Sequence, residues 1–222
     1  MNYSLLAATP LFRGITQTEI ESMLICLNAR EREYPKDTAI LRAGDTTHEL
    51  GLVLAGSVSI ESDDLWGNKT VLDHIGSGCV FAETYACIQG EALMVNVITM
   101  EPTTILFLHI GKILEVCQKT CAYHTKLIRN LLSIAAQKNL NLSRRSFYTA
   151  PKSIRGRLLS YLSFQAMKQG SRDFYIPFNR QQLADYLNVD RSALSNELGK
   201  MQRENLLAIN KNHFIVSEQV AE

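Results

Sequence analysis

The sequence predicts an α+β protein: an N-terminal antiparallel β-roll of the jelly-roll type with flanking helices, a long helix, and a C-terminal winged helix-turn-helix. Between residues 34 and 109, short β-branched runs alternate with glycine-containing turns. From 113 to 147, apolar residues recur at helical spacing. After residue 178, two short helical patterns meet at a tight turn and precede a hairpin. The expected domain boundaries are 1–115 for the roll, 116–148 for the long helix and 149–222 for the winged helix-turn-helix.

The net charge of +1 conceals an asymmetry along the chain. Residues 1–115 contain seven Lys and Arg against fifteen Asp and Glu, whereas residues 116–222 contain sixteen against seven. Basic surfaces attract the phosphates of nucleic acids and acidic surfaces repel them. We therefore expect the second half to bind nucleic acid and the first half to do something else.

Five cysteines are an odd number, and we interpret them as reduced thiols. The first residues lack the basic start and long apolar core of a signal peptide. No apolar run approaches the roughly 18 residues needed to span a membrane. We expect a cytoplasmic protein with no membrane partner.

Residues 5–27 predict two helical pieces, and Thr16 with Glu19 forms a capping-box pattern at the start of the second. We interpret them as packing helices. The strands that follow form a barrel or jelly-roll that can enclose a small ligand. Their turns contain glycine in four places: Gly44-Asp45, Gly56-Ser57, Gly67-Asn68 and Gly76-x-Gly78.

The long helix has more apolar surface than one roll can cover, which favours pairing with a second copy of the chain. The alternative is a helix packed wholly within its own chain. Its apolar face includes Leu132 and the seven residues expected at a dimer interface: Tyr123, Leu127, Ile128, Leu131, Ile134, Ala135 and Leu142. Pro151 ends the pattern, so residues 148–151 are the candidate hinge.

The stretch from Phe178 to Leu207 predicts a helix-turn-helix. Asn179 and Asp190 are suited to cap its two helices, and Asn188 tolerates the left-handed conformation that a sharp turn needs. The polar side chains of the second helix are expected on its exposed face, where a recognition helix would meet the major groove. An ordinary helical hairpin with a solvated polar face is the alternative. The candidate DNA-binding residues are Arg180, Gln181, Arg191, Ser192, Ser195, Asn196 and Lys200.

The order of these motifs resembles the Crp/Fnr family of bacterial transcription regulators. In the roll, the resemblance rests on Gly44-Asp45, Gly56-Ser57-Val58, Gly76-x-Gly78 and Phe81-Ala82-Glu83. In the second half, it rests on Arg180-Gln181-x-Leu183-Ala184 and Asp190-Arg191-x-x-Leu194. It implies a cyclic-nucleotide-binding-like roll and a homodimer that binds a pseudo-palindromic double-stranded DNA site. It also implies a small-molecule effector and makes RNA polymerase a candidate partner.

The departures from the family bear on the signal. Members that bind cyclic AMP use a Gly-Glu pair and an Arg-Ser pair, whereas here Ala82 precedes Glu83 and Leu93-Met94 stands near the Arg-Ser position. A buried cyclic phosphate needs a cation or strong hydrogen-bond donors. We therefore expect that cyclic AMP is not bound in the usual way. The expected signal is an apolar or neutral ligand, or a redox change. A cyclic-nucleotide regulator with a non-standard cassette is the alternative. The candidate effector pocket comprises Glu83, Thr84, Tyr85, Leu93, Met94 and Val95.

Other chemistry finds little support in the sequence. An N-terminal iron–sulfur cluster is not supported, since only Cys26 precedes residue 79, and we expect no cofactor or metal. Cys117, Cys121 and His124 have a spacing that suits a metal or redox site, but two buried thiols are the preferred interpretation. His48, His74 and His109 are isolated, which counts against a cupin-like enzyme. No nucleophile motif or phosphate loop is present, so we expect no enzyme; a constitutive DNA-binding protein remains a third hypothesis.

In the recognition helix, Arg191 and Ser195 match base-reading positions of the family, while Asn196 stands where Arg is frequent. Asn pairs well with adenine. We therefore expect a half-site that differs from the usual family consensus and contains an adenine position.

Overall fold

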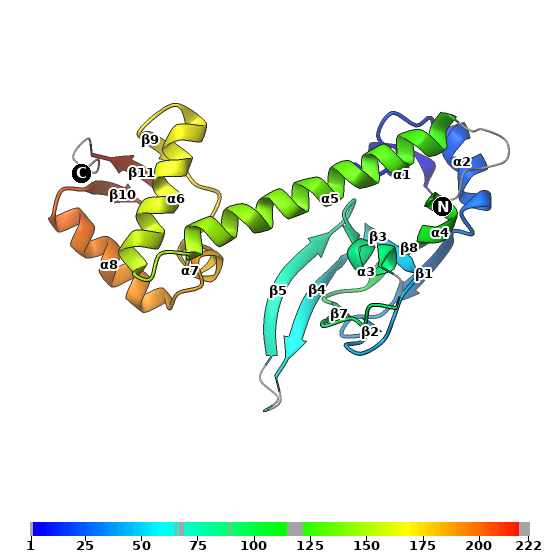
Figure 1. Ribbon diagram of the computed structural model, residues 1–222, viewed down its shortest axis with the longest axis horizontal. Coiled ribbons are helices and arrows are strands. Elements are labelled where there is room, and N and C mark those ends of the chain that lie inside the picture. The colour runs from blue at the N-terminus through cyan, green and yellow to red at the C-terminus, as the bar shows by residue number, and fades with distance from the viewer. Residues whose placement is uncertain (1, 65, 67–68, 89, 115–121, 218–222) are drawn as a thin grey trace. The chain divides into compact units, whose positions relative to one another are not determined.

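The computed structural model describes residues 2–64, 66, 69–88, 90–114 and 122–217. It divides into two compact units, Met1–Gln137 and Lys138–Glu222. Figure 1 labels the helices and all of the strands except β6. Among the helices of the described residues, none has the length and apolarity to cross a lipid bilayer.

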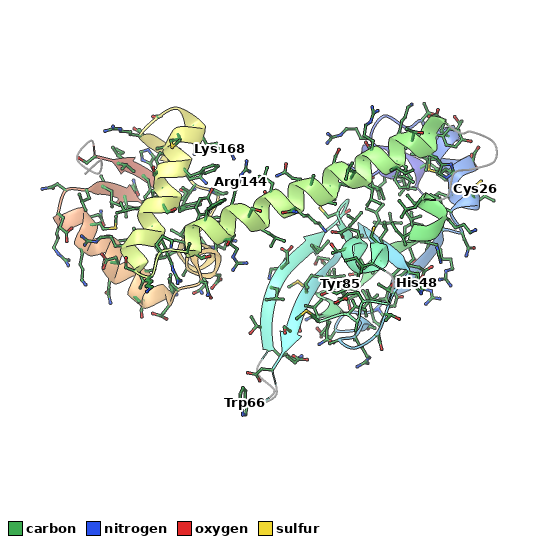
Figure 2. All side chains as sticks on the ribbon, in the orientation of Figure 1. Cys26, His48, Trp66, Tyr85, Arg144 and Lys168 are labelled. Carbon is green, nitrogen blue, oxygen red and sulfur yellow. The ribbon has the colours of Figure 1, made fainter. Side chains whose placement is uncertain are left out.

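The first unit contains two four-stranded antiparallel sheets, which confirms the predicted roll. One sheet has the order β1-β8-β3-β6 and the other the order β2-β7-β4-β5. Figure 1 shows β4 and β5 as a long hairpin, and Trp66 lies in its turn region (Figure 2). The strands are β1 (Arg30–Tyr34), β2 (Ala39–Leu41), β3 (Glu49–Ala55), β4 (Ser57–Asp63), β5 (Lys69–Gly76), β6 (Val80–Phe81), β7 (Asn96–Thr99) and β8 (Thr103–His109).

Short helices flank the roll: α1 (Tyr3–Ala8), α2 (Gln17–Cys26), α3 (Glu83–Cys87) and α4 (Ile110–Leu114). The predicted capping box is present, because Thr16 Oγ1 accepts from Glu19 N and Glu19 Oε2 accepts from Thr16 N. Ile20, Met23 and Leu24 are buried, so α2 is the packing helix that its spacing predicts.

Two apolar clusters stabilise the first unit. One lies between the roll and its helices and includes residues of α2, β3, β8 and α4. The other is formed by the strands, with Phe81 and Phe107 in edge-to-face contact at 6.4 Å between ring centroids. A Cβ at position 51 would lie 2.1 Å from the Phe81 ring, so Gly51 is needed for that ring to pack against β3.

Helix α5 runs from Ala122 to Thr149, whereas the sequence predicts a long helix over 116–148, of which 116–121 lie outside the described residues. In the first unit, Leu127 and Leu131 belong to the apolar core. Lys126 donates to Gly14 O at 2.9 Å, and Asn130 donates to Leu11 O and Arg13 O, both at 2.9 Å. This face of α5 is therefore held by its own chain.

The second unit begins within α5, at Lys138, rather than after it. Its other elements are α6 (Ile154–Gln169), β9 (Asp173–Tyr175), α7 (Arg180–Leu187), α8 (Arg191–Arg203), β10 (Leu207–Asn210) and β11 (His213–Val216). The three strands form an antiparallel sheet in the order β10-β11-β9. Gly170 ends α6 with a φ of 64°, as the sequence predicts for a helix C-cap.

Tyr148, at the start of the expected hinge, is buried in the core of the second unit. Its ring lies 5.5 Å from the ring centroids of Tyr161 and of Phe164 and 6.1 Å from that of Tyr186. The last turns of α5 are thus packed against α6 and α7. This packing explains why the boundary between the compact units lies inside the helix.

Candidate DNA-binding surface and effector region

Helices α7 and α8 have the local signals that their sequence predicts. Asn179 Oδ1 accepts from Gln182 N at 2.9 Å, and Gln182 Oε1 accepts from Asn179 N at the same distance. Asn188 has a φ of 53° and ends α7 in the left-handed conformation. Asp190 Oδ1 accepts from Ala193 N at 2.8 Å and caps α8.

Two guanidinium groups hold the turn between these helices. Arg157 Nη1 donates to Leu187 O at 3.1 Å and Asn188 O at 2.7 Å. Arg145 Nε donates to Tyr186 O at 3.0 Å, and its Nη2 donates to Asp185 O at 2.9 Å. Because α7 has no basic residue in its own last turn, α5 and α6 supply the positive charge that its carbonyl end favours.

Helix α8 has one buried and one exposed face. Leu194, Leu198 and Met201 are buried in the core of the second unit. The opposite face contains the candidate base-reading residues, all exposed: Arg191, Ser192, Ser195, Asn196 and Lys200. Helical spacing therefore brings these side chains to one surface, as the sequence predicts.

Two side chains on this exposed face contact acidic residues close to them in the sequence. The Ser192 hydroxyl donates to the Asp190 carboxylate, and this hydrogen bond lowers the pKa of Asp190. Lys200 Nζ lies 3.7 Å from Glu197 Oε2. Since Ser192 and Lys200 are both exposed, such pairs are weak and exchange readily for a phosphate.

Arg180 and the turn of the β10–β11 hairpin line one hollow of about 490 Å³. The guanidinium of Arg180 lies 5.9 Å from the centroid of Phe214, and its burial lowers the pKa of Arg180. Lys211 and Asn212 belong to the hairpin turn, with a φ of 56° at Lys211. Arg180 is predicted from the sequence, whereas these two turn residues are not, although a two-residue turn between the strands could have revealed them.

Gln181 belongs to the same helix end as Arg180 and is exposed. Its Nε2 donates to Asp185 Oδ1 at 2.8 Å, one turn along α7. This contact is between side chains on a helix surface and leaves Gln181 accessible.

The candidate effector residues lie on two segments that meet near the turn at Gly44. Gly44 N donates to Leu93 O and Leu93 N donates to Asp45 O, both at 2.8 Å. Met94 N donates to the Tyr85 hydroxyl of α3 at 3.4 Å. Figure 2 shows Tyr85 on that helix. Burial divides the set: Glu83 and Leu93 are buried, Tyr85 and Val95 are half-buried, and Thr84 and Met94 are exposed.

The backbone before Glu83 is unusual. Ala82 has a φ of 60°, a conformation that glycine adopts without strain and alanine does not. The chain therefore retains the local backbone that a glycine would favour, with a methyl group added.

The dimer candidates on α5 fall into two groups. Leu127 and Leu131 are buried by their own chain, and Tyr123, Ile128 and Ile134 pack partly against the same core. Ala135 and Leu142 are exposed. Leu132, which is not among the residues expected at the interface, is 68% exposed, as is Leu142. Leu127 and Leu131 therefore have no surface to offer a partner.

The other candidate ligands do not form a site among the described residues. Cys117 and Cys121 lie outside these residues, while His124 is buried. His48 and His109 stack at 6.2 Å between ring centroids, and His74 Nδ1 lies 3.1 Å from Met100 Sδ. Within the described ranges, no three His, Cys, Asp or Glu side chains gather as metal ligands would.

Comparison with known proteins agrees with this architecture. Residues 31–120 match the model of the cyclic nucleotide-binding domain, and residues 156–220 match that of the Crp-like helix-turn-helix domain. The chain is 21% identical over 188 residues to the cAMP-activated global transcriptional regulator CRP of Haemophilus influenzae, covering 83% of this chain and 82% of that one. It is 23% identical over 188 residues to the CRP-like protein Clp of Xanthomonas euvesicatoria, covering 81% and 80%.

A solved structure of CprK, complexed with OCPA, has the same fold. Its TM-score is 0.64 at 17% identity, with 89% of this chain and 88% of that chain covered. The matched cyclic nucleotide-binding domain corresponds to the roll, and the matched Crp-like helix-turn-helix domain corresponds to the helix-turn-helix unit. The chain belongs to the Crp/Fnr family and is a Crp-like DNA-binding transcription regulator with an effector-binding domain.

Proposed function

We propose that this regulator acts as a homodimer that reads a pseudo-palindromic DNA site through two copies of α8. The observation that carries the proposal is the exposed polar face of α8, which a capped and clamped turn holds in place. A rigid recognition helix with polar side chains on its first turns is the geometry that reads the major groove.

The side chains suggest a division of roles on DNA. Arg191 is suited to pair bidentately with guanine and Asn196 with adenine, while Ser195 can bond to several bases. Arg180 and Lys211 line the hollow between α7 and the hairpin turn, where they can contact phosphate. Helix α8 would then recognise base pairs, while Arg180 and Lys211 would contact the DNA backbone.

Dimerisation would use the exposed part of α5. Leu132 and Leu142 each expose 68% of their surface, and Ala135 lies between them on the same side. Exposed leucines repeated along a helix favour pairing with another helix. Two copies of α8 could then read two half-sites about one helical turn of DNA apart.

The effector would be an apolar or neutral small molecule, or a redox signal, rather than cyclic AMP bound in the usual way. Residues 93–95 contribute only Leu, Met and Val side chains beside the turn at Gly44. None of these can neutralise a cyclic phosphate. Glu83 is buried close by in the chain and would add negative charge if ionised.

Selection of binding sites from a randomised DNA pool tests the DNA-binding part. We expect a two-fold symmetric site with an adenine in each half. Arg191→Ala should cost about 1–3 kcal/mol on that site and relax discrimination at one base pair. Lys211→Ala is the matched control, because it should weaken binding to all DNA sequences alike. A loss for Arg191→Ala that is equal on all sequences would contradict base reading.

Addition of cyclic AMP to the selected complex tests the effector part. We expect its DNA dissociation constant to stay the same. A clear tightening would instead favour a cyclic-nucleotide-responsive regulator with a non-standard phosphate site.

A further inference from the structure

Helix α8, the proposed recognition helix, contains a single acidic residue, Glu197. It follows Asn196 directly and precedes Lys200 by one turn, and both of these residues are exposed. A carboxylate is unfavourable on a helix that approaches DNA, because phosphates repel negative charge. The groups that neutralise Glu197 therefore bear on how α8 binds DNA.

Arg155, in the first turn of α6, holds Glu197. Its Nε donates to Glu197 Oε1 at 2.6 Å, while its Nη1 and Nη2 donate to the two carboxylate oxygens of Glu204 at 2.7 and 2.8 Å. The bonds to Glu204 and Glu197 raise the pKa of Arg155, and the bond from Arg155 lowers the pKa of Glu204. Because Glu204 fixes the planar guanidinium from one side, its Nε is already in place for Glu197.

Lys200 is a second cation beside Glu197, and it is held less firmly. Its Nζ lies 3.7 Å from Glu197 Oε2, beyond the roughly 2.7–3.2 Å of a normal hydrogen bond. The side chain of Lys200 is 58% exposed, whereas that of Glu197 is 16% exposed. Water and salt therefore screen the ammonium, while the carboxylate depends on a close partner. Arg155 is that partner, and Lys200 is left weakly paired.

We infer that Arg155 is a positioning residue for DNA binding: by holding Glu197, it leaves the ammonium of Lys200 available to a DNA phosphate. This inference rests on the proposed function, in which the exposed face of α8 meets DNA. Arg155 acts through Glu197 and does not itself contact the duplex. Lys200 then adds a backbone contact to those proposed for Arg180 and Lys211.

Without Arg155, Lys200 should turn towards Glu197. A largely buried carboxylate that has lost its close partner is strongly unfavourable, so it would draw in the remaining cation. The two residues are three apart on one helix, which lets their side chains meet. DNA would then have to break this pair before a phosphate could take the place of the carboxylate.

The salt dependence of DNA binding tests the inference, because its slope reports the number of phosphate contacts. We define the Lys200 contribution as the change that Lys200→Ala causes in the slope of log affinity against log salt on the selected operator. It is measured in the unaltered full-length chain, in a chain with Arg155→Met, and in a chain with both Arg155→Met and Glu197→Gln. Circular dichroism and urea denaturation show whether each chain is folded.

We expect the Lys200 contribution to be about 0.9 per half-site in the unaltered chain. With Arg155→Met, it should fall below about 0.3, because Glu197 then retains the ammonium. The added Glu197→Gln should restore it, since the charge that captures Lys200 is gone.

Two controls separate this coupling from simpler effects. Lys168→Met removes a positive charge from the last turn of α6 (Figure 2), and the Lys200 contribution should keep its full size there. Glu197→Gln alone tests the same point if Arg155→Met does not fold. The Lys200 contribution should be as large in that chain as in the unaltered one, because Arg155 already holds the carboxylate.

An equal Lys200 contribution with and without Arg155 would overturn the inference. Failure of the added Glu197→Gln to restore the contribution, or a larger contribution with Glu197→Gln alone, would also overturn it. If an operator is selected but Lys200→Ala leaves the slope of the unaltered chain as it is, the inference fails and the proposed function stands. If no operator is selected, the proposed function fails and the inference fails with it.

Discussion

Gly199 lies in the interior of α8, on the exposed face that also carries Ser195 and Asn196. Glycine costs about 0.5–1 kcal/mol relative to alanine inside a helix. Packing does not require it, because a Cβ at this position would meet only Arg203 Nη1, at 3.8 Å. A glycine that the fold does not need is expected where the helix backbone comes close to a ligand.

Gly199→Ala should therefore stabilise the protein and weaken DNA binding at the same time. We expect the free energy of unfolding to rise by about 0.5–1 kcal/mol and DNA affinity to fall by about threefold or more. Urea denaturation and DNA titration at fixed salt measure the two effects. Gly156→Ala is the contrasting control, since its Cβ would lie 2.9 Å from Pro151 Cβ and should destabilise the fold. Unchanged DNA affinity for Gly199→Ala would argue against close approach.

The leucines of α5 show how far single residues can be predicted from the sequence. Helical spacing identifies an apolar face that includes Leu131 and Leu132, and it cannot tell which of the two meets its own chain. The structure separates them, with Leu131 buried against the first unit and Leu132 exposed. The difference depends on tertiary packing, which periodicity does not encode.

Helix α7 is short, and its carbonyl end depends on other elements for its charge. Arg157 on α6 and Arg145 on α5 together bond to four consecutive carbonyls, from Asp185 to Asn188. These contacts stabilise the left-handed turn that determines the angle between α7 and α8. The capping signals of both helices are evident in the sequence, whereas this clamp joins residues distant in the chain and is not.

Arg157→Ala should loosen the turn. The substitution removes the charged hydrogen bonds to Leu187 O and Asn188 O, and also the one that Arg157 Nε donates to Pro151 O at 2.9 Å. Their loss should cost about 1.5–3 kcal/mol in the free energy of unfolding and weaken specific DNA binding. Arg157→Lys should restore only part of both, because an ammonium lacks the planar fork. Urea denaturation and titration of the selected operator measure both variants.

Arg144→Ala is the matched control for the clamp. Its guanidinium, on α5 in Figure 2, lies 5.4 Å from the centroid of the Phe164 ring. That contact contributes about 0.5–1 kcal/mol. Equal destabilisation by Arg157→Ala and Arg144→Ala would speak against a special role for the clamp.

The boundary between the compact units is an element-scale feature that the sequence does not predict. Pro151 correctly marks the end of α5, but the units divide at Gln137 and Lys138, inside the helix. The apolar pattern continues without change across that point. Only the burial of Tyr148 among the rings of α6 and α7 assigns the last turns of α5 to the second unit.

At the scale of the whole molecule, the distribution of charge and the order of the motifs predict the architecture best. The acidic half forms most of the first unit, and the basic half contains the whole helix-turn-helix. Glycine turns predicted the roll, and caps predicted α7 and α8, because these signals are local. The effector region depends on contacts between distant segments, such as those of Leu93 with Gly44 and Asp45, which no local pattern reveals.

The charge asymmetry makes the salt dependence of DNA binding a test of the whole arrangement. Removing one phosphate contact should reduce the slope of log affinity against log salt by about 0.9. Lys211→Ala, at the hairpin turn, should therefore flatten this slope by about 0.9 per half-site and leave sequence preference unchanged. Lys69→Ala, in the acidic first unit, is the matched control and should leave the slope as it is. Titrations of the selected operator between 50 and 200 mM salt, roughly the range over which phosphate contacts show most clearly, measure both variants. If Lys211→Ala keeps the original slope, Lys211 does not contact the DNA backbone, and other basic residues of the second unit carry the electrostatic part of binding.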